Sequence, residues 1–208
     1  MSKRIAIVGS GTMGKLLASF LSSDNHITMI TRDTFLTTRW EDFNVICLAI
    51  KPQDFQLITT LSLSHTLIIS VMTGITTETL IKITHSAAVI RTMPNTPIKI
   101  GLGVTAWCKT KAVTQADSQW FQNAFSKVSK LIDVENDDGI NKATAISGCG
   151  PAYVFAFAEA LMSAACELGF SEDQAQLLVT QTCVGATALL EQATVPVAEL
   201  RQQVTSKG

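Results

Sequence analysis

The sequence is poor in the residues that mark a metal site, a disulfide framework or a nucleic-acid surface. It has three histidines and five cysteines in 208 residues, and no two cysteines are spaced Cys-x-x-Cys. An odd number of cysteines in mostly apolar runs is typical of reduced thiols, so we expect no disulfide framework and no metal site. The 16 basic residues against 17 acidic ones leave a net charge of −1, which gives no electrostatic case for nucleic acid.

Long apolar runs without a charge are also missing. The most apolar stretch, residues 152–168, contains Glu159 and Glu167 and is short for a membrane span, so we predict a buried helix there. Residues 1–4 run directly into a first predicted strand without a signal-peptide core, and we expect a cytoplasmic protein with no membrane partner. The hydrophobic share of 47% still supplies a substantial core.

A glycine-rich turn opens the chain. Residues 5–8 have a short β-branched strand pattern, and a helix pattern covers residues 15–21. A strand, the spacing G-x-G-x-x-G and a helix form the dinucleotide-binding fingerprint, in which helix-start amides face the diphosphate. Its glycines allow the tight turn, the approach of the pyrophosphate and the close packing of helix on strand. We predict a dinucleotide site, with a ligand-free turn as the alternative, at Gly9, Ser10, Gly11, Thr12, Met13 and Gly14.

Strand and helix patterns alternate as far as residue 134. Almost wholly apolar strands indicate a sheet covered on both faces. We therefore predict an α/β fold with a Rossmann-like dinucleotide-binding domain over residues 1–134. Strands are predicted at 26–31, 44–50, 66–71, 87–91, 101–107 and 129–134, and helical segments at 39–42, 53–62, 76–81 and 115–125.

After residue 134 only helix patterns remain, which predicts a small all-α domain over residues 135–208. Its helices are predicted at 141–146, 152–168, 172–192 and 197–204. The acidic cluster Glu135, Asp137 and Asp138 is interpreted as a solvated helix cap. So few helices cannot bury their apolar residues alone, so we predict a homodimer formed through the C-terminal helices.

Two polar segments are candidates for ligand contacts. Thr31 and Arg32 follow the second predicted strand, where an acidic residue would hold the ribose of NAD. A hydroxyl and a cation suit the 2′-phosphate of NADP instead, so we predict NADP, with NAD and a solvated turn as alternatives. The small-residue segment from Ser147 to Ala152 precedes a long helix, and its free amides would form a pocket for a carboxylate. A plain turn between helices is the alternative there.

Four segments, taken in order along essentially the whole chain, resemble pyrroline-5-carboxylate reductase, the last enzyme of proline biosynthesis. They are Gly9-Ser10-Gly11-Thr12-Met13-Gly14, Ala49-Ile50-Lys51-Pro52, Arg91-Thr92-Met93-Pro94-Asn95-Thr96-Pro97 and Ser147-Gly148-Cys149-Gly150-Pro151-Ala152-Tyr153-Val154-Phe155. The resemblance implies hydride transfer from NAD(P)H to the C=N carbon of 1-pyrroline-5-carboxylate, an imino acid, giving L-proline. Positioning and anion binding then supply most of the rate, and no catalytic side chain is expected.

The resemblance also implies which residues contact the two ligands. The implied cofactor residues are those of the glycine turn together with Thr31, Arg32, Ala49, Ile50, Lys51, Pro52, Met72, Thr73, Gly74 and Asn95. The implied substrate residues are Ser147, Gly148, Cys149, Gly150, Pro151, Ala152 and Gln203. Cys149 falls where the family carries a small residue, so it is interpreted as a spacer and not as a nucleophile.

The sequence departs from the family at two places. The segment after the second predicted strand is abridged, and the family's Ser-Pro-Gly-Gly-Thr-Thr-like loop and later helices have no counterpart after residues 200–208. The helical domain is therefore expected to be a short version, and the alternative is a nucleotide-binding relative that lacks turnover and acts by binding or assembly. A third interpretation is a different NADP oxidoreductase of similar architecture, such as a hydroxyacid dehydrogenase. Such an enzyme usually has a catalytic lysine in the first long interdomain helix, and the helix at 151–168 contains none.

Overall fold

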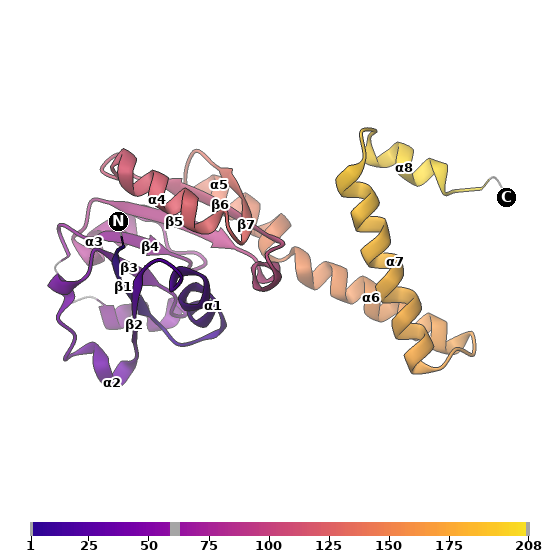
Figure 1. Cartoon of the computed structure of the whole chain (residues 1–208), viewed down its shortest axis with the longest axis horizontal. Helices are drawn as coiled ribbons and strands as arrows, with labels where there is room; N and C mark the ends of the chain where they lie inside the picture. The colour runs from indigo at the N-terminus through magenta and orange to yellow at the C-terminus, as the bar shows by residue number, and fades with distance from the viewer. Residues whose placement is uncertain (1, 59–62, 207–208) are drawn as a thin grey trace. The chain divides into compact units, whose positions relative to one another are not determined.

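The structure, a computed structural model, describes residues 2–58 and 63–206 and divides into two compact units after Pro151 (Figure 1). The first unit contains a seven-stranded sheet in the order β2-β1-β3-β4-β5-β6-β7, in which only the β5–β6 pair is antiparallel. The strands are β1 (Arg4–Val8), β2 (His26–Ile30), β3 (Val45–Leu48), β4 (Leu67–Ser70), β5 (Val89–Pro94), β6 (Gly103–Lys109) and β7 (Ser129–Asp133).

Helices of the first unit connect these strands. They are α1 (Thr12–Leu21), α2 (Arg32–Phe35), α3 (Thr77–Thr84), α4 (Gln115–Phe125) and α5 (Asp137–Ala143), with the 3-10 segments η1 (Trp40–Asp42), η2 (Pro52–Ile58) and η3 (Thr96–Ile100) and the π-helical segment η4 (Thr144–Gly148). The predicted α/β fold with a Rossmann-like sheet is confirmed.

The sheet is buried on both faces because alternate residues of its strands enter two different apolar clusters. In β1, Ile5 and Ile7 join the cluster covered by α1 and α4, whereas Ala6 and Val8 join the cluster covered by η2 and α3. All four side chains are at most 4% exposed. This two-sided burial accounts for the continuous apolar strands of the sequence.

Two of the predicted connections differ from the structure. The crossover between β2 and β3 contains two short helical segments, α2 at Arg32–Phe35 and η1 at Trp40–Asp42, whereas the sequence predicts a single turn of helix. The helix predicted at 53–62 is instead the 3-10 segment η2, Pro52–Ile58, and residues 59–62 lie outside the described residues. Both segments are too short for a hydrophobic period to define them.

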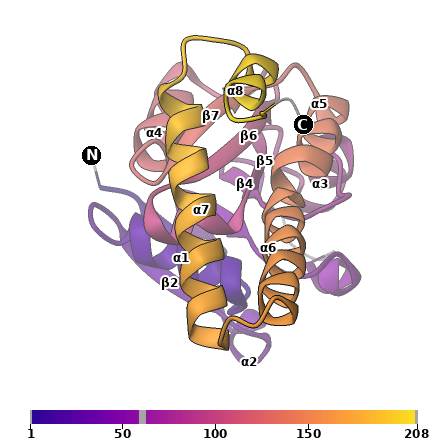
Figure 2. The same ribbon diagram turned by 90° about the vertical axis from the view of Figure 1, so that its right-hand side faces the viewer.

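The second unit consists of helices with little interior of their own. It contains α6 (Gly150–Glu167, which begins just before the unit does), α7 (Glu172–Gln192) and α8 (Val197–Gln203). Figure 2 shows α6 and α7 joined at their lower ends. There Gly169, at φ 96°, ends α6, and its amide donates to the carbonyl oxygen of Cys166 at 2.9 Å.

The prediction that residues 152–168 form a buried helix is wrong in one respect, since α6 has no buried residue. In the described part of the chain the helical run Asp137–Glu167 is long and apolar enough to cross a membrane, by length and composition only. Large apolar side chains are exposed along the second unit, among them Phe155 at 67%, Leu177 at 68% and Leu189 at 66%. An exposed apolar surface of this extent requires a partner surface that packs against it.

The contacts divide the chain later than the predicted boundary between residues 134 and 135. Helix α5 lies against β5 and β6, and Ile140 is fully buried in a small cluster with Met93 and Ala106. The helical region therefore begins within the first compact unit. The position of the boundary between the functional domains stays a prediction.

Candidate dinucleotide and anion site

The glycine turn after β1 has the geometry that its spacing predicts. Gly9 has φ 110°, and a Cβ atom there would lie 2.5 Å from the carbonyl oxygen of Ala49. A Cβ atom on Gly14 would lie 2.0 Å from the carbonyl oxygen of Gly9, so both positions exclude any larger residue. By contrast, a Cβ atom on Gly11 would meet nothing within 4 Å. The open side of Gly11 fits the approach of a pyrophosphate to the backbone.

Hydrogen bonds bring the predicted cofactor segments to one edge of the sheet. The Gly9 amide donates to the Ile30 carbonyl oxygen at 3.0 Å, and the Ala49 amide donates to that of Val8 at 2.9 Å. The Val71 amide donates to the carbonyl oxygen of Leu48 at 3.1 Å. The segments after β1, β2, β3 and β4 therefore start side by side at the carboxyl edge. The strand order reverses at β1 and β3, where open α/β sheets bind their ligands.

The two residues predicted to contact a 2′-phosphate already have partners within the chain. The Thr31 amide donates to the hydroxyl of Thr34 at 3.0 Å as α2 begins. The Arg32 guanidinium donates to Asp54 Oδ1 at 2.8 Å. No local pattern indicates this ion pair, because Asp54 is 22 positions away in the η2 segment.

Asn95 links the end of β5 to the predicted substrate segment. Its Oδ1 atom accepts from the Val104 amide at 2.9 Å, and its Nδ2 atom donates to the carbonyl oxygen of Ser147 at 3.2 Å. A Cβ atom on Gly148 would lie 3.5 Å from the Met93 side chain, so this segment lies directly against β5. A contact between Asn95 and a cofactor stays a prediction.

The substrate segment is not the loop that the sequence predicts. Residues Thr144–Gly148 form a π-helical turn between α5 and α6, and the Cys149 amide donates to the Thr144 carbonyl oxygen at 2.9 Å. That amide is therefore not free to bind an anion. Single π-helical turns inside helices are frequent at functional sites, which is consistent with a ligand role for this segment. Ala152 and Gln203 belong to the second unit, in α6 and α8, and their substrate contacts stay predictions.

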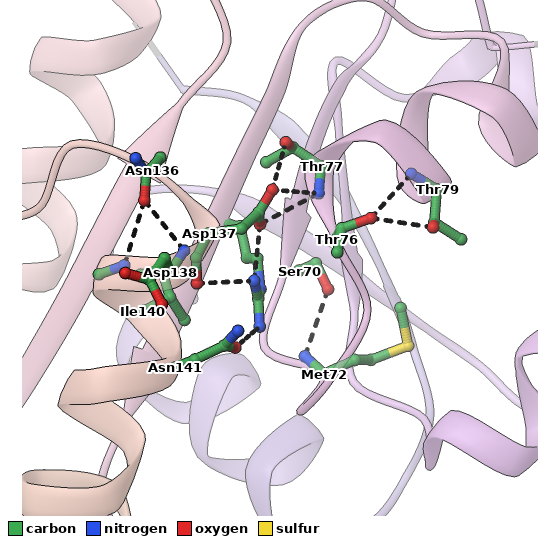
Figure 3. Close-up of polar contacts among 12 residues, drawn as sticks. Ser70, Met72, Thr76, Thr77, Thr79, Asn136, Asp137, Asp138, Ile140 and Asn141 are labelled. Carbon is green, nitrogen blue, oxygen red and sulfur yellow. Dashed lines mark hydrogen bonds and ion pairs between the residues drawn. The ribbon is translucent and has the colours of Figure 1, made fainter.

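A polar cluster in the first unit contains Thr77, Asp137 and Asn141 (Figure 3), and a buried arginine is hydrogen-bonded to two of them. Arg91 in β5 is 0% exposed. Its Nη1 atom donates to Asp137 Oδ1 at 2.6 Å, and its Nη2 atom donates to Asn141 Oδ1 at 2.8 Å. Asp137 also accepts from Thr77, from the hydroxyl at 2.8 Å and from the amide at 3.1 Å. The cluster ties together β5, the start of α3 and the start of α5.

This cluster corrects the interpretation of Asp137 as part of a solvated cap. Burial raises the pKa of its carboxyl, but the hydrogen bonds from Arg91 and Thr77 outweigh burial and hold the pKa below its ordinary value. A sequence signal did exist. An arginine within an otherwise apolar strand must find a carboxylate partner, because an unpaired buried charge is too costly.

The cluster also positions both halves of the candidate site. Helix α3 starts at Thr77, just after the predicted cofactor residues Met72, Thr73 and Gly74, and α5 leads directly into η4 and the substrate segment. The Met72 amide donates to Ser70 Oγ at 3.2 Å, which fixes the exit of β4 (Figure 3).

The buried thiols are unsuited to nucleophilic chemistry. Burial raises the pKa of Cys47 to about 12 and that of Cys108 to about 11, so both stay protonated at neutral pH. Within residues 2–58 and 63–206, no group of three or more His, Cys, Asp or Glu side chains is placed to hold a metal ion.

Comparison with known proteins links the whole chain to one enzyme family. Residues 137–208 match the family described as pyrroline-5-carboxylate reductase dimerisation. Pyrroline-5-carboxylate reductase 2 of Bacillus subtilis is 31% identical over 99% of this chain and 83% of its own length. The pyrroline-5-carboxylate reductase of Pasteurella multocida is 33% identical over 81% of this chain, and the match spans 63% of that protein.

A solved structure extends the similarity to three dimensions. The pyrroline carboxylate reductase of Plasmodium falciparum, crystallised with NADP bound, superimposes with a TM-score of 0.86 at 25% identity. The superposition covers 99% of this chain and 85% of that one.

Proposed function

Since the chain belongs to the pyrroline-5-carboxylate reductase family, we propose that it reduces 1-pyrroline-5-carboxylate to L-proline with NAD(P)H as the hydride donor. One observation carries the proposal: similarity to reductases of this name runs through 99% of the chain, including the glycine turn that is shaped for a dinucleotide. NADP is the preferred cofactor because the related structure from Plasmodium falciparum has it bound.

The residues at the carboxyl edge of the sheet hold the dinucleotide in this proposal. Gly11 presents open backbone to the pyrophosphate, whereas Gly9 and Gly14 let the turn and the start of α1 pack closely against each other and against Ala49, just after β3. Arg32 faces the adenosine end, and the residues after β4, from Met72 to Gly74, lie against the nicotinamide. Bound there, the reduced nicotinamide supplies the hydride.

The segment from Ser147 to Ala152 receives the substrate carboxylate. The carbonyl oxygen of Ser147 accepts a hydrogen bond from Asn95, just after β5, so the first residue of the segment is fixed against the carboxyl edge of the sheet. The cyclic imine enters already protonated, and the chain needs no general acid. Its contribution is to orient the C=N carbon and to exclude water. No side chain is assigned as an acid, a base or a nucleophile.

We further propose that the active form is a homodimer in the cytoplasm, joined by α6, α7 and α8. The match of residues 137–208 to a dimerisation family supports the dimer, and so do the exposed apolar side chains of the second unit. A second copy would cover α6, which has no buried residue in the single chain, and α7, in which Ala175 and Val179 alone are buried.

The test is NADPH oxidation on addition of 1-pyrroline-5-carboxylate, together with the reverse reaction of proline with NAD(P)⁺ at alkaline pH. Separate titrations of NADPH and NADH into the same full-length protein accompany the assay. Turnover confirms the reductase. Binding without turnover favours the alternative, a nucleotide-binding relative that acts by assembly, and a protein that binds neither cofactor contradicts both.

A further inference from the structure

The ion pair between Arg32 and Asp54 lies at the edge of the sheet where the adenosine end of a dinucleotide belongs. Arg32 follows β2 and Asp54 follows β3, and these strands flank β1 on either side. The two residues therefore approach one another across the end of β1 and its glycine turn. Arg32 Nη2 lies 2.8 Å from Asp54 Oδ1.

The two members of this pair differ in how firmly they are held. The Asp54 side chain is 30% exposed and belongs to η2, which also places Phe55 and Ile58 in the core. The Arg32 side chain is 76% exposed, so it is the partner that moves. A guanidinium has five donors and binds a phosphate in bidentate fashion, but a carboxylate already on it competes with the phosphate and repels it.

We propose that Asp54 is a specificity-determining residue of the dinucleotide site, because its carboxylate competes with the 2′-phosphate of NADPH for the Arg32 guanidinium. Dinucleotide folds that prefer NAD usually place an acidic residue at the end of the second strand, where it binds the ribose 2′-hydroxyl. Here Asp54 supplies that carboxylate from the segment after β3. Asp54 thereby lowers the preference of the site for NADPH over NADH. This inference rests on the proposed dinucleotide site and not on turnover.

The experiment compares dissociation constants of NADPH and NADH, by calorimetric titration of full-length protein at one pH and one salt concentration. The variants are Asp54→Asn, Arg32→Ala and the double variant, and Asp33→Asn serves as the matched control. Asp33 lies beside Arg32, so its replacement makes the same change in net charge without breaking the ion pair. All these side chains lie at least partly at the surface, and circular dichroism verifies that each variant is folded.

Asp54→Asn is expected to tighten NADPH binding about tenfold, the scale expected for a phosphate dianion a few ångströms from one carboxylate at an exposed site. NADH binding should be unchanged or slightly weaker. In the Arg32→Ala background the same substitution should have less than about a third of this effect. Equal changes for both cofactors, an equal effect of Asp33→Asn, or an effect that persists without Arg32 would overturn the inference. A wild-type protein that binds neither cofactor overturns the dinucleotide site itself, whereas binding without turnover leaves this inference standing.

Discussion

Replacing Asp137 by asparagine should destabilise the first unit strongly, because it removes the only carboxylate described in contact with the buried guanidinium of Arg91. The structure sets the size of the effect. Arg91 is 0% exposed and Asp137 is 25% exposed, so the pair is sheltered but water reaches the carboxylate. Removing one partner of a buried pair costs about 3–5 kcal/mol of unfolding free energy, and the partial exposure of Asp137 places the expected loss near the lower end, about 3 kcal/mol.

The assay is urea denaturation at pH 7, followed by tryptophan fluorescence at one fixed protein concentration. All three tryptophans lie in the first unit, at positions 40, 107 and 120, so their emission reports its unfolding. The concentration must be fixed because a dimer gains stability with concentration.

The control is Lys142→Ala, which breaks the pair that Lys142 forms with Asp138 on the same helix, α5. Those side chains are 78% and 67% exposed, so the free energy of unfolding is expected to change little. If Asp137→Asn lowers the free energy of unfolding by no more than Lys142→Ala does, the structural role of the Arg91 cluster is refuted.

The folded-state pKa of Asp137 is lowered, so the stabilisation that its carboxylate provides is present above the unfolded pKa of about 3.9 and is lost as the pH falls through the folded value. When the free energy of unfolding is measured against pH, Asp137→Asn should therefore lose less stability on acidification than wild type. Gly11→Ala should abolish measurable NADPH binding and lower the free energy of unfolding by no more than about 1 kcal/mol. Gly14→Ala should lower both NADPH binding and the urea midpoint, since its Cβ would lie 2.0 Å from a carbonyl oxygen. A Gly11→Ala variant that binds NADPH normally contradicts the pyrophosphate assignment. Ellman's reagent at pH 8 should label the exposed Cys149 in the folded protein and Cys47, whose pKa is about 12, only after unfolding; early labelling of Cys47 would contradict its burial.

Much of the fold was predictable because its signals are local. Helix α7 begins and ends at the predicted residues, since Ser171 and Gln174 form a capping box and a helical period of apolar residues follows. The glycine turn was equally predictable, because Gly9 and Gly14 satisfy local steric constraints and Gly11 leaves the backbone open on one side.

The parts that sequence reasoning missed depend on contacts between distant residues. The pairing of Arg91 with Asp137 spans 46 positions, and that of Arg32 with Asp54 spans 22. The sequence shows that these residues are charged, but it does not show which strand ends lie next to one another in the sheet. The π-helical form of Thr144–Gly148 was missed for another reason: its small residues and glycine are as compatible with a loop as with a helix.

Following the transferred hydride tests the proposed reductase activity itself. The full-length protein is incubated with 1-pyrroline-5-carboxylate and NADPH that carries deuterium at the transferable position of the nicotinamide, and the product is examined by mass spectrometry and NMR. A reductase produces L-proline with one deuterium on the ring carbon that was double-bonded to nitrogen, in amounts equal to the NADPH consumed. Proline without deuterium, or bound NADPH that is never consumed, would contradict this activity.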